Sequence, residues 1–389
     1  MMIEKIRTEN YKSLLDVELD LGRINVFIGA NGSGKSNILE AVAMLASERV
    51  IKMKDLSDKG VRIAKPSLTF SSFLGKKSEE EIKGYIQFDD KKERESVITN
   101  EDSKDIYADW YHKRTYKNNG KVELILDPRW PQPGPFPIGE GTGKERASRR
   151  VLEENFMNFE RKYLSGYLIY SLWTNALRGI TNSSTVTPLG INGEGLDLLL
   201  STFDTHEMEQ LKYFGKKCIS WIDDFFYDEG EILKRQGYKL GRSTSNLYFQ
   251  DKYMQKKENV FSAENANEGA LHLLFYLALF ISKKTPAFFA VDNIETGMNP
   301  ELCRFLIKYL CELSQANNKQ ALITTHNPAI LNGLNLHDDN QRLFVVTRRD
   351  DGQTRVERIR LKPNIEGQEK VMLSELWIRG FLGGVPDNF

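Results

Sequence analysis

The segment from Gly29 to Ser36 has the residue types and spacing of a phosphate-binding loop. It reads GANGSGKS and matches the Walker A pattern G-x-x-x-x-G-K-[S/T] at every fixed position. Glycines let the backbone turn tightly, so that its N–H groups point at phosphate oxygens. Lys35 can reach the terminal phosphates of a nucleoside triphosphate, and the Ser36 hydroxyl can bind Mg²⁺. The segment therefore predicts a site for ATP and Mg²⁺, with these candidate nucleotide-binding residues: Asn31, Gly32, Ser33, Gly34, Lys35, Ser36 and Asn37.

The elements on either side of this loop are the ones that such a site needs. Residues 24–28 (INVFI) form an apolar run typical of a buried strand, and residues 38–45 have the apolar spacing of a helix. A helix that begins at the loop adds partial positive charge where phosphate would bind. The alternative is a glycine-rich turn before an ordinary helix. Such a turn would not need to match the Walker A pattern at every fixed position.

Two further apolar strands end in residues that could complete the site. Residues 288–292 (FFAVD) end in Asp292, and residues 321–326 (ALITTH) end in His326. A carboxylate at the end of a parallel strand beside the phosphate loop can hold Mg²⁺, so Asp292 joins Ser36 as a candidate metal ligand. Alone, an apolar run that ends in Asp is a weak signal, and a single His is more often structural.

A third stretch, residues 263–270 (AENANEGA), precedes an apolar helix over 271–281. Asn267, Glu268 and Gly269 would present a helix N-terminus to an anion. The alternative is a simple helix cap without a ligand.

Composition limits the remaining possibilities. Lys plus Arg equals Asp plus Glu at 54 each in 389 residues, so no global positive charge indicates nucleic acid, although a local basic face is compatible with this balance. The three cysteines form no C-x-x-C pair, so neither a zinc site nor a disulfide framework is indicated. No signal peptide or membrane span is apparent, and the sequence predicts a soluble, cytoplasmic protein.

The rest of the chain suggests an α/β head with an insertion. Alternating residues over 3–7 and 15–19 predict an antiparallel pair, and residues 68–70 and 84–88 are further strand-like pieces. Residues 100–143 look polar and loop-like, with a proline-rich surface connection over 127–137. Helical patterns follow over 145–178 and 194–227, then hairpins over 230–252 and 342–359. The predicted division is 1–99, N-terminal lobe; 100–230, inserted mainly helical subdomain; 231–389, C-terminal lobe.

These motifs, in this order, resemble the ABC-type ATPases of the SMC, RecF and OLD group. The resemblance is carried by Asn10-Tyr11-Lys12-Ser13-Leu14, by the loop form GANGSGKSN, by Asp292 to Pro300, and by Thr324 to Pro328. The tail LSELWIRG…GGVP (373–386) resembles stand-alone ATPases of bacterial abortive-infection (AbiL-like) operons. The resemblance covers about residues 1–90 and 260–389. It implies an ABC-type head that combines a mixed or parallel sheet with an antiparallel N-terminal β subdomain.

The resemblance also implies how the site would work. Two ATP molecules would be held in a head-to-tail homodimer, in which residues 267–269 of one copy contact the γ-phosphate bound by Lys35 of the other. Asn267 replaces the signature serine of the group, but it can still donate to a phosphate oxygen. His326 resembles the histidine that reads the γ-phosphate. Gln87 and Gln132 are candidates for the glutamine that bridges metal and water.

The predicted catalytic residues are Asn293, Glu295 and His326. Asn293 stands where the group has a catalytic glutamate, and an amide cannot act as a general base, although it can hold a water. Glu295 would face the same side if the chain stays extended. Either Glu295 substitutes as the base, or hydrolysis is slow and the ATP-bound form is long-lived, which we favour.

Three functions are compatible with these features. The first is a dimeric ATPase switch that senses or clamps nucleic acid and controls a partner effector in anti-phage defence. The second is a DNA-repair or maintenance ATPase, and the third is a nucleotide-gated scaffold that restrains a toxin without contacting DNA. Only 63 residues follow His326, which is short for a TOPRIM nuclease domain. We therefore expect a TOPRIM-like nuclease effector to be encoded separately.

Overall fold

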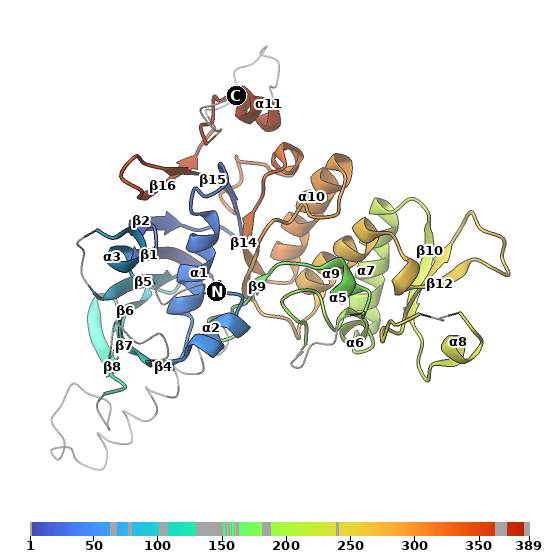
Figure 1. Cartoon of the computed structure of the whole chain (residues 1–389), viewed down its shortest axis with the longest axis horizontal. Helices are drawn as coiled ribbons and strands as arrows, with labels where there is room; N and C mark the ends of the chain where they lie inside the picture. The colour runs from blue at the N-terminus through green and yellow to red at the C-terminus, as the bar shows by residue number, and fades with distance from the viewer. Residues whose placement is uncertain are drawn as a thin grey trace.

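The computed structural model describes residues 2–62, 68–76, 80–100, 108–129, 163–180, 188–238, 241–361 and 372–384, together with residues 151, 154, 156, 158 and 160. Within these residues the chain forms three β-sheets with helices between and beside them (Figure 1).

The six-stranded sheet carries the phosphate-loop strand near its middle. Its strand order is β16–β15–β3–β14–β13–β9, and all strands run parallel except β16, which pairs antiparallel with β15. The strands are β3 (Ile24–Ile28), β9 (Ile169–Tyr170), β13 (Phe288–Val291), β14 (Gln320–Thr324), β15 (Gln341–Arg348) and β16 (Thr354–Ile359). Because parallel strands end at one edge of a sheet, the residues that follow β3, β13 and β14 meet there.

Both faces of this sheet are covered, which explains the continuous apolar runs of its strands. Along β3, Ile24, Val26 and Ile28 join a core made with α7 (Thr205–Cys218), α9 (Glu268–Ile281) and α10 (Pro300–Ala316). Phe27 points the other way, into a core made with α1 (Lys35–Leu45) and the second large sheet. The predicted strands over 24–28, 288–292 and 321–326 are therefore confirmed within two residues of their ends.

The second sheet has seven strands and is antiparallel. Its order is β2–β1–β5–β6–β7–β4, with β8 paired to β7. The strands are β1 (Ile3–Tyr11), β2 (Leu14–Asp20), β4 (Val50–Ile51), β5 (Ile82–Phe88), β6 (Lys92–Asn100), β7 (Trp110–Asn118) and β8 (Lys121–Leu126), and two short helices, α2 (Met53–Asp58) and α3 (Phe70–Leu74), accompany them. The α1 helix lies between this sheet and the six-stranded sheet (Figure 1). The predicted N-terminal antiparallel β subdomain is confirmed.

Part of the predicted middle region is different from the expectation. Residues 110–126 are strands β7 and β8, not a loop, and β7 pairs with β6 along its whole length. Residues 222–227 are strand β10, not the end of a helix, and β10 pairs with β11. Strand pairing thus crosses both predicted boundaries, at residues 99/100 and 230/231. The proline-rich run over 127–137 lies, from Trp130 on, outside the described residues.

The helical part of the middle region packs on α9. Helices α5 (Thr174–Leu177), α6 (Leu196–Leu200) and α7 lie against α9. Every residue of α9 from Gly269 to Ile281 is buried, and its sequence is apolar on all sides, as expected for a helix inside the core. No helix in the described part of the chain is both long enough and apolar enough to span a membrane.

The third sheet lies at one end of the molecule. It consists of β10 (Ile222–Tyr227), β11 (Leu247–Asp251) and β12 (Val260–Ser262), with α8 (Ile232–Arg235) in the connection between β10 and β11. The predicted hairpin over 230–252 is wrong, because β11 pairs with β10 and β12 instead. After β12 comes a single 3-10 turn, η1 (Ala263–Asn265), and then α9.

The C-terminal part adds a hairpin to the parallel sheet. The predicted hairpin over 342–359 is confirmed as β15 and β16, and β15 pairs with β3. The 3-10 helix η2 (Pro328–Gly333) packs on α10, and α11 (Leu373–Ile378) packs on η2.

Candidate functional site

The phosphate loop forms a tight turn between β3 and α1. Gly34 has φ 109°, in the left-handed region, and a Cβ at this position would lie 2.1 Å from the Thr354 hydroxyl oxygen. A Cβ at Gly29 would lie 2.1 Å from the carbonyl oxygen of Val346. Only glycine fits at these two positions, because a side chain would meet the C-terminal hairpin.

Lys35 lies at the centre of this loop. Its ammonium group donates to the carbonyl oxygens of Gly29, at 2.8 Å, and Ala30, at 2.9 Å. Burial lowers the pKa of Lys35 to about 8, against the opposing effect of Asp292 and Glu295. Phosphate oxygens would replace the carbonyl acceptors and favour the charged form, so the lysine is suited to an anionic ligand.

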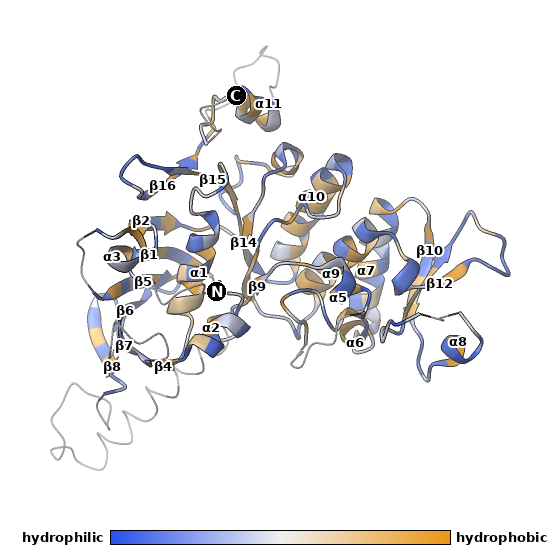
Figure 2. Cartoon of the chain, viewed as in Figure 1, coloured by the Kyte–Doolittle hydropathy of each residue, from blue (hydrophilic) through white to orange (hydrophobic). Residues whose placement is uncertain are grey.

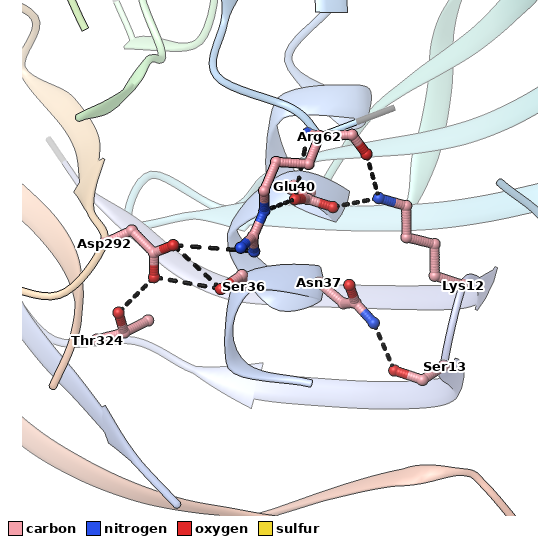
Figure 3. Close-up of polar contacts among 8 residues, drawn as sticks. All are labelled: Lys12, Ser13, Ser36, Asn37, Glu40, Arg62, Asp292 and Thr324. Carbon is pink, nitrogen blue, oxygen red and sulfur yellow. Dashed lines mark hydrogen bonds and ion pairs between the residues drawn. The ribbon is translucent and has the colours of Figure 1, made fainter. Parts of the chain in front are cut away.

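The predicted metal ligands are in contact. The Ser36 hydroxyl donates to the Asp292 carboxylate, 3.1 Å from Oδ2, and the Thr324 hydroxyl donates to Oδ1 at 2.5 Å (Figure 3). Mg²⁺ in nucleotide sites takes one or two protein oxygens, and phosphate oxygens and water complete its shell. The oxygens of Ser36 and Asp292 fit such an ion. A further buried oxygen of the loop, Ser33 Oγ, has no partner among the described residues.

The chain turns immediately after Asp292. Asn293 has φ 56°, and its N–H donates to the Thr324 hydroxyl at 2.9 Å. Its carbonyl oxygen accepts from the N–H of Thr296 at 3.2 Å. The expectation that Glu295 would face the same side as Asn293 in an extended chain is therefore wrong.

Glu295 nevertheless reaches the same edge of the sheet. Its Oε1 accepts from the backbone N–H of His326 at 2.8 Å, and its Oε2 is buried without a partner among the described residues. Burial and the Lys35 ammonium lower the pKa of His326 below its usual value, against Glu295 and Asp292. A neutral imidazole at pH 7 can donate one hydrogen bond to a phosphate oxygen or to a water.

Sequence reasoning missed a second cation at this edge. Arg62 lies with its Nη2 3.8 Å from Asp292 Oδ2, and its Nε donates to Glu40 at 3.0 Å. Glu40 is a buried carboxylate on α1 that also pairs with Lys12, which in turn donates to the Arg62 carbonyl at 2.9 Å. Figure 3 shows this chain of contacts running from the β1–β2 turn across α1 to Asp292. The sequence contains a signal for these contacts, because the carboxylate of Glu40 interrupts the apolar face of α1.

The C-terminal hairpin supports the outer side of the loop. The Thr354 hydroxyl donates to the Ser33 carbonyl at 2.9 Å and lies 2.8 Å from the Ser13 hydroxyl. The Asn37 amide donates to Ser13 at 2.7 Å, and Arg348 donates to the Gly32 carbonyl at 3.0 Å. The loop is thus held by residues from both ends of the chain. Its tip, Asn31 and Gly32, is exposed.

The predicted helix start lies apart from the phosphate loop. Asn267 caps α9, and its side-chain oxygen accepts from the Ala270 N–H at 3.3 Å. Glu268 accepts from the Thr174 hydroxyl at 2.6 Å, and Gly269 packs beside the Gly297 carbonyl. Within the described residues, no hydrogen bond or ion pair joins residues 267–269 to residues 29–37. In the described part of a single copy, these two segments are therefore not joined by any hydrogen bond or ion pair.

The candidate glutamines do not complete the site. Gln87 lies on β5, where its amide nitrogen is 3.5 Å from Glu4 Oε2, and among the described residues no hydrogen bond joins it to the phosphate loop. Gln132 lies outside the described residues.

Comparison with solved structures identifies the architecture. A structure described as an SMC head bound to the C-terminal winged-helix domain of ScpA is similar over 93% of this chain and 99% of that chain, with a TM-score of 0.56 and 17% identity. The fold is that of an ABC-type ATPase head. The SMC head domain from Thermotoga maritima is also similar, at 13% identity over 93% of this chain and all of that chain (100%), with a TM-score of 0.48.

Two family descriptions match parts of this ABC-type ATPase head. Residues 1–161 match "AAA ATPase domain", and residues 222–332 match "AAA domain, putative AbiEii toxin, Type IV TA system". The first match contains the phosphate loop, and the second contains Asp292 and His326. The predicted ABC-type head fold is therefore confirmed, and two segments of the chain are similar to AAA ATPase domains. A search of curated proteins found no match.

Proposed function

We propose that the chain is an ATP-gated switch that dimerises around ATP and Mg²⁺, senses or clamps nucleic acid, and controls a separately encoded effector in anti-phage defence. The observation that carries the proposal is the convergence of Lys35, Ser36 and Asp292 at the edge where β3, β13 and β14 end. The Ser36 hydroxyl is 3.1 Å from the Asp292 carboxylate, so one divalent ion can contact both.

Each residue of the site has a chemical role in this proposal. Lys35 binds the terminal phosphates, and Ser36 and Asp292 hold Mg²⁺, which neutralises phosphate charge. Thr324 fixes the orientation of Asp292 through its 2.5 Å hydrogen bond. His326 and Glu295 are joined by a backbone hydrogen bond, so a displacement of one moves the other.

We further propose that hydrolysis is slow. Asn293 directly follows the candidate metal ligand Asp292 in sequence, and an amide cannot accept the proton of an attacking water as a base does. Glu295 is the nearest carboxylate after it, and one of its oxygens is committed to His326. A slow reaction would give a long-lived ATP-bound dimer, which suits a switch better than a motor.

The dimer would complete the site. Asn267 is exposed, and its side-chain oxygen is used in capping, so its amide N–H groups remain to donate to a γ-phosphate of the partner copy. The N-terminus of α9 adds a favourable dipole, because α9 has fourteen residues and begins at Glu268.

Sedimentation with paired variants tests this arrangement. We expect ATP with Mg²⁺ to dimerise the wild type and not Lys35→Ala or Asn267→Ala. In a head-to-tail dimer, a mixture of the two variants forms one intact site from Lys35 of one copy and Asn267 of the other, so the mixture should regain ATP-dependent dimers. Failure of the mixture to assemble, while wild type does, would contradict the shared site.

The effector part of the proposal draws on two of the similarities described above. One matching family is described as an "AAA domain, putative AbiEii toxin, Type IV TA system", and the similar SMC head was solved with a bound domain of ScpA. We expect this chain to co-purify with the product of a neighbouring gene, a TOPRIM-like nuclease. DNA cleavage by the co-purified proteins, measured with and without ATP, tests this expectation. Cleavage that is independent of ATP would contradict the proposal that this chain controls the effector.

A further inference from the structure

The connections around the third sheet carry a concentration of positive charge that the whole chain lacks. Residues 232–257 contain seven Lys or Arg residues and one acidic residue, Asp251, whereas the chain balances 54 basic with 54 acidic residues. The basic residues are Lys234, Arg235, Lys239, Arg242, Lys252, Lys256 and Lys257, of which Lys239 lies outside the described residues.

The described members of this group are exposed, and most keep their charge unpaired. Lys234 pairs with Glu231 at 2.8 Å. In the part of the chain that the structure describes, no carboxylate pairs with Arg235, Arg242, Lys256 or Lys257. Asp251 is used locally, since its Oδ1 accepts from the N–H of Tyr253 at 2.7 Å. Over residues 229–258, which add Glu229, Glu231 and Glu258, seven basic residues still outnumber four acidic ones, so the net charge of the two connections stays positive.

Exposed aromatic rings lie among these cations. Tyr253 is 74% exposed, and the Lys252 ammonium lies 4.9 Å from the centre of its ring. Tyr238 is 36% exposed in the other connection. An exposed tyrosine ring beside a cation offers a flat face on which a planar group can stack.

The base of the two connections is rigid. Phe249 and Phe261 face each other across β11 and β12, with ring centres 6.0 Å apart, and Trp221 packs on Phe261 at 5.6 Å. Both connections belong to the end of the molecule farthest from α3 and β8 (Figure 1). Figure 2 shows the β11–β12 connection largely in the blue of hydrophilic residues.

We propose that this basic–aromatic tip, residues 232–238, Arg242 and residues 252–257, binds single-stranded nucleic acid. Lysine and arginine would neutralise backbone phosphates. The Tyr253 ring would stack on a base, which is accessible in a single strand and hidden in a duplex. The inference rests on the proposed function, because it supplies the site at which nucleic acid would be sensed.

The tip is joined directly to the start of α9. Strand β12 continues into η1 and Asn267 within five residues of Ser262. The N–H of Arg242 donates to Glu264 of η1 at 3.2 Å, and Arg178 donates to the Ala266 carbonyl at 3.2 Å. A ligand that shifts the tip therefore acts on the segment that would contact the partner's ATP. By linkage, ATP and single-stranded nucleic acid should each strengthen the binding of the other.

Fluorescence anisotropy with a labelled 20-nucleotide oligo-dT tests the proposal on the full chain. We expect wild type to bind, and to bind more tightly with a slowly hydrolysed ATP analogue and Mg²⁺. Lys256→Ala/Lys257→Ala should lower the salt slope, log K against log salt, by about 1.4. Tyr253→Ala should weaken binding about 5- to 100-fold. Lys54→Ala/Lys308→Ala, which removes two exposed lysines elsewhere, should leave binding unchanged.

The outcomes separate this inference from the function it rests on. If wild type binds oligo-dT and the tip variants bind equally well, the tip is not the site, although nucleic-acid sensing stands. If wild type binds no nucleic acid in any nucleotide state, both this inference and the nucleic-acid sensing in the proposed function are wrong. If heparin competes fully and Tyr253→Ala has no effect, the tip is a general polyanion surface, and the inference of single-strand recognition is wrong.

Discussion

Thr324 provides the sharpest test of how the metal site is held. Its side chain is fully buried, its hydroxyl donates to Asp292 at 2.5 Å, and it accepts from the Asn293 N–H at 2.9 Å. Thr324→Val keeps the shape and removes both bonds. A hydrogen bond to a charged group contributes about 1.5–3 kcal/mol, and an unsatisfied buried N–H costs about 1–3 kcal/mol. We expect roughly 3–5 kcal/mol of local destabilisation if neither group finds another partner.

The functional consequence should appear in the metal dependence. Residues that orient a metal ligand typically change metal affinity by about 10- to 100-fold. Titration of a fluorescent ATP analogue at a series of Mg²⁺ concentrations should therefore show a 10- to 100-fold higher Mg²⁺ requirement for Thr324→Val. Thr324→Ser keeps the hydroxyl and should stay near wild type. A folded Thr324→Val protein with the Mg²⁺ dependence of wild type would refute the reasoning.

Three further predictions concern the loop and the catalytic edge. Burial lowers the pKa of Lys35 to about 8 and a bound triphosphate would raise it, so ATP binding should weaken by up to about tenfold per pH unit above pH 8. Titrations from pH 7 to 9.5 measure this, and Lys35→Arg should show no such dependence. Asn293→Glu should raise ATP turnover by on the order of 10²-fold, while Glu295→Gln should abolish residual turnover if Glu295 is the base; fast wild-type turnover indifferent to both changes would exclude both roles. Gly34→Ala should abolish ATP binding, since its Cβ would lie 2.1 Å from the Thr354 hydroxyl oxygen. Gly32→Ala has open space around its Cβ, so it should weaken ATP binding by only about 1–2 kcal/mol, the cost of a left-handed backbone conformation for alanine. Equal losses of ATP binding in the two variants would contradict the steric argument.

The sequence was sufficient to predict those elements whose geometry is determined by one short segment. The phosphate loop, β3, β13 and β14 could be predicted because buried parallel strands are continuous apolar runs and their ends must meet. Glu295 was different. Its position depends on the left-handed φ of Asn293, 56°, and an asparagine adopts such a conformation only sometimes. No spacing rule reveals that turn.

Strand β7 was missed because two of the four residues on its buried face are polar. His112 and Arg114 on β7 are buried, at positions where an apolar residue would have revealed the strand. Arg114 pairs with Glu160, and so does Arg94 of β6. A buried charge is tolerated only when it is paired, and the partner here is 46 residues from Arg114 in sequence. A local sequence pattern cannot show a pairing over this separation. The charged residues of β7 were therefore interpreted as part of an exposed loop.

The hairpin of β15 and β16 has a consequence for how the protein matures. The hydrogen bonds of Thr354 and Arg348 to the phosphate loop span more than three hundred residues of chain, and β3 obtains both of its neighbours, β14 and β15, from the last quarter of the sequence. During translation the N-terminal glycine loop would leave the ribosome long before the C-terminal hairpin can support it. Nucleotide capture would then be acquired in a single late event, when the hairpin docks, and prematurely terminated chains would be unable to sequester ATP or engage a full-length copy.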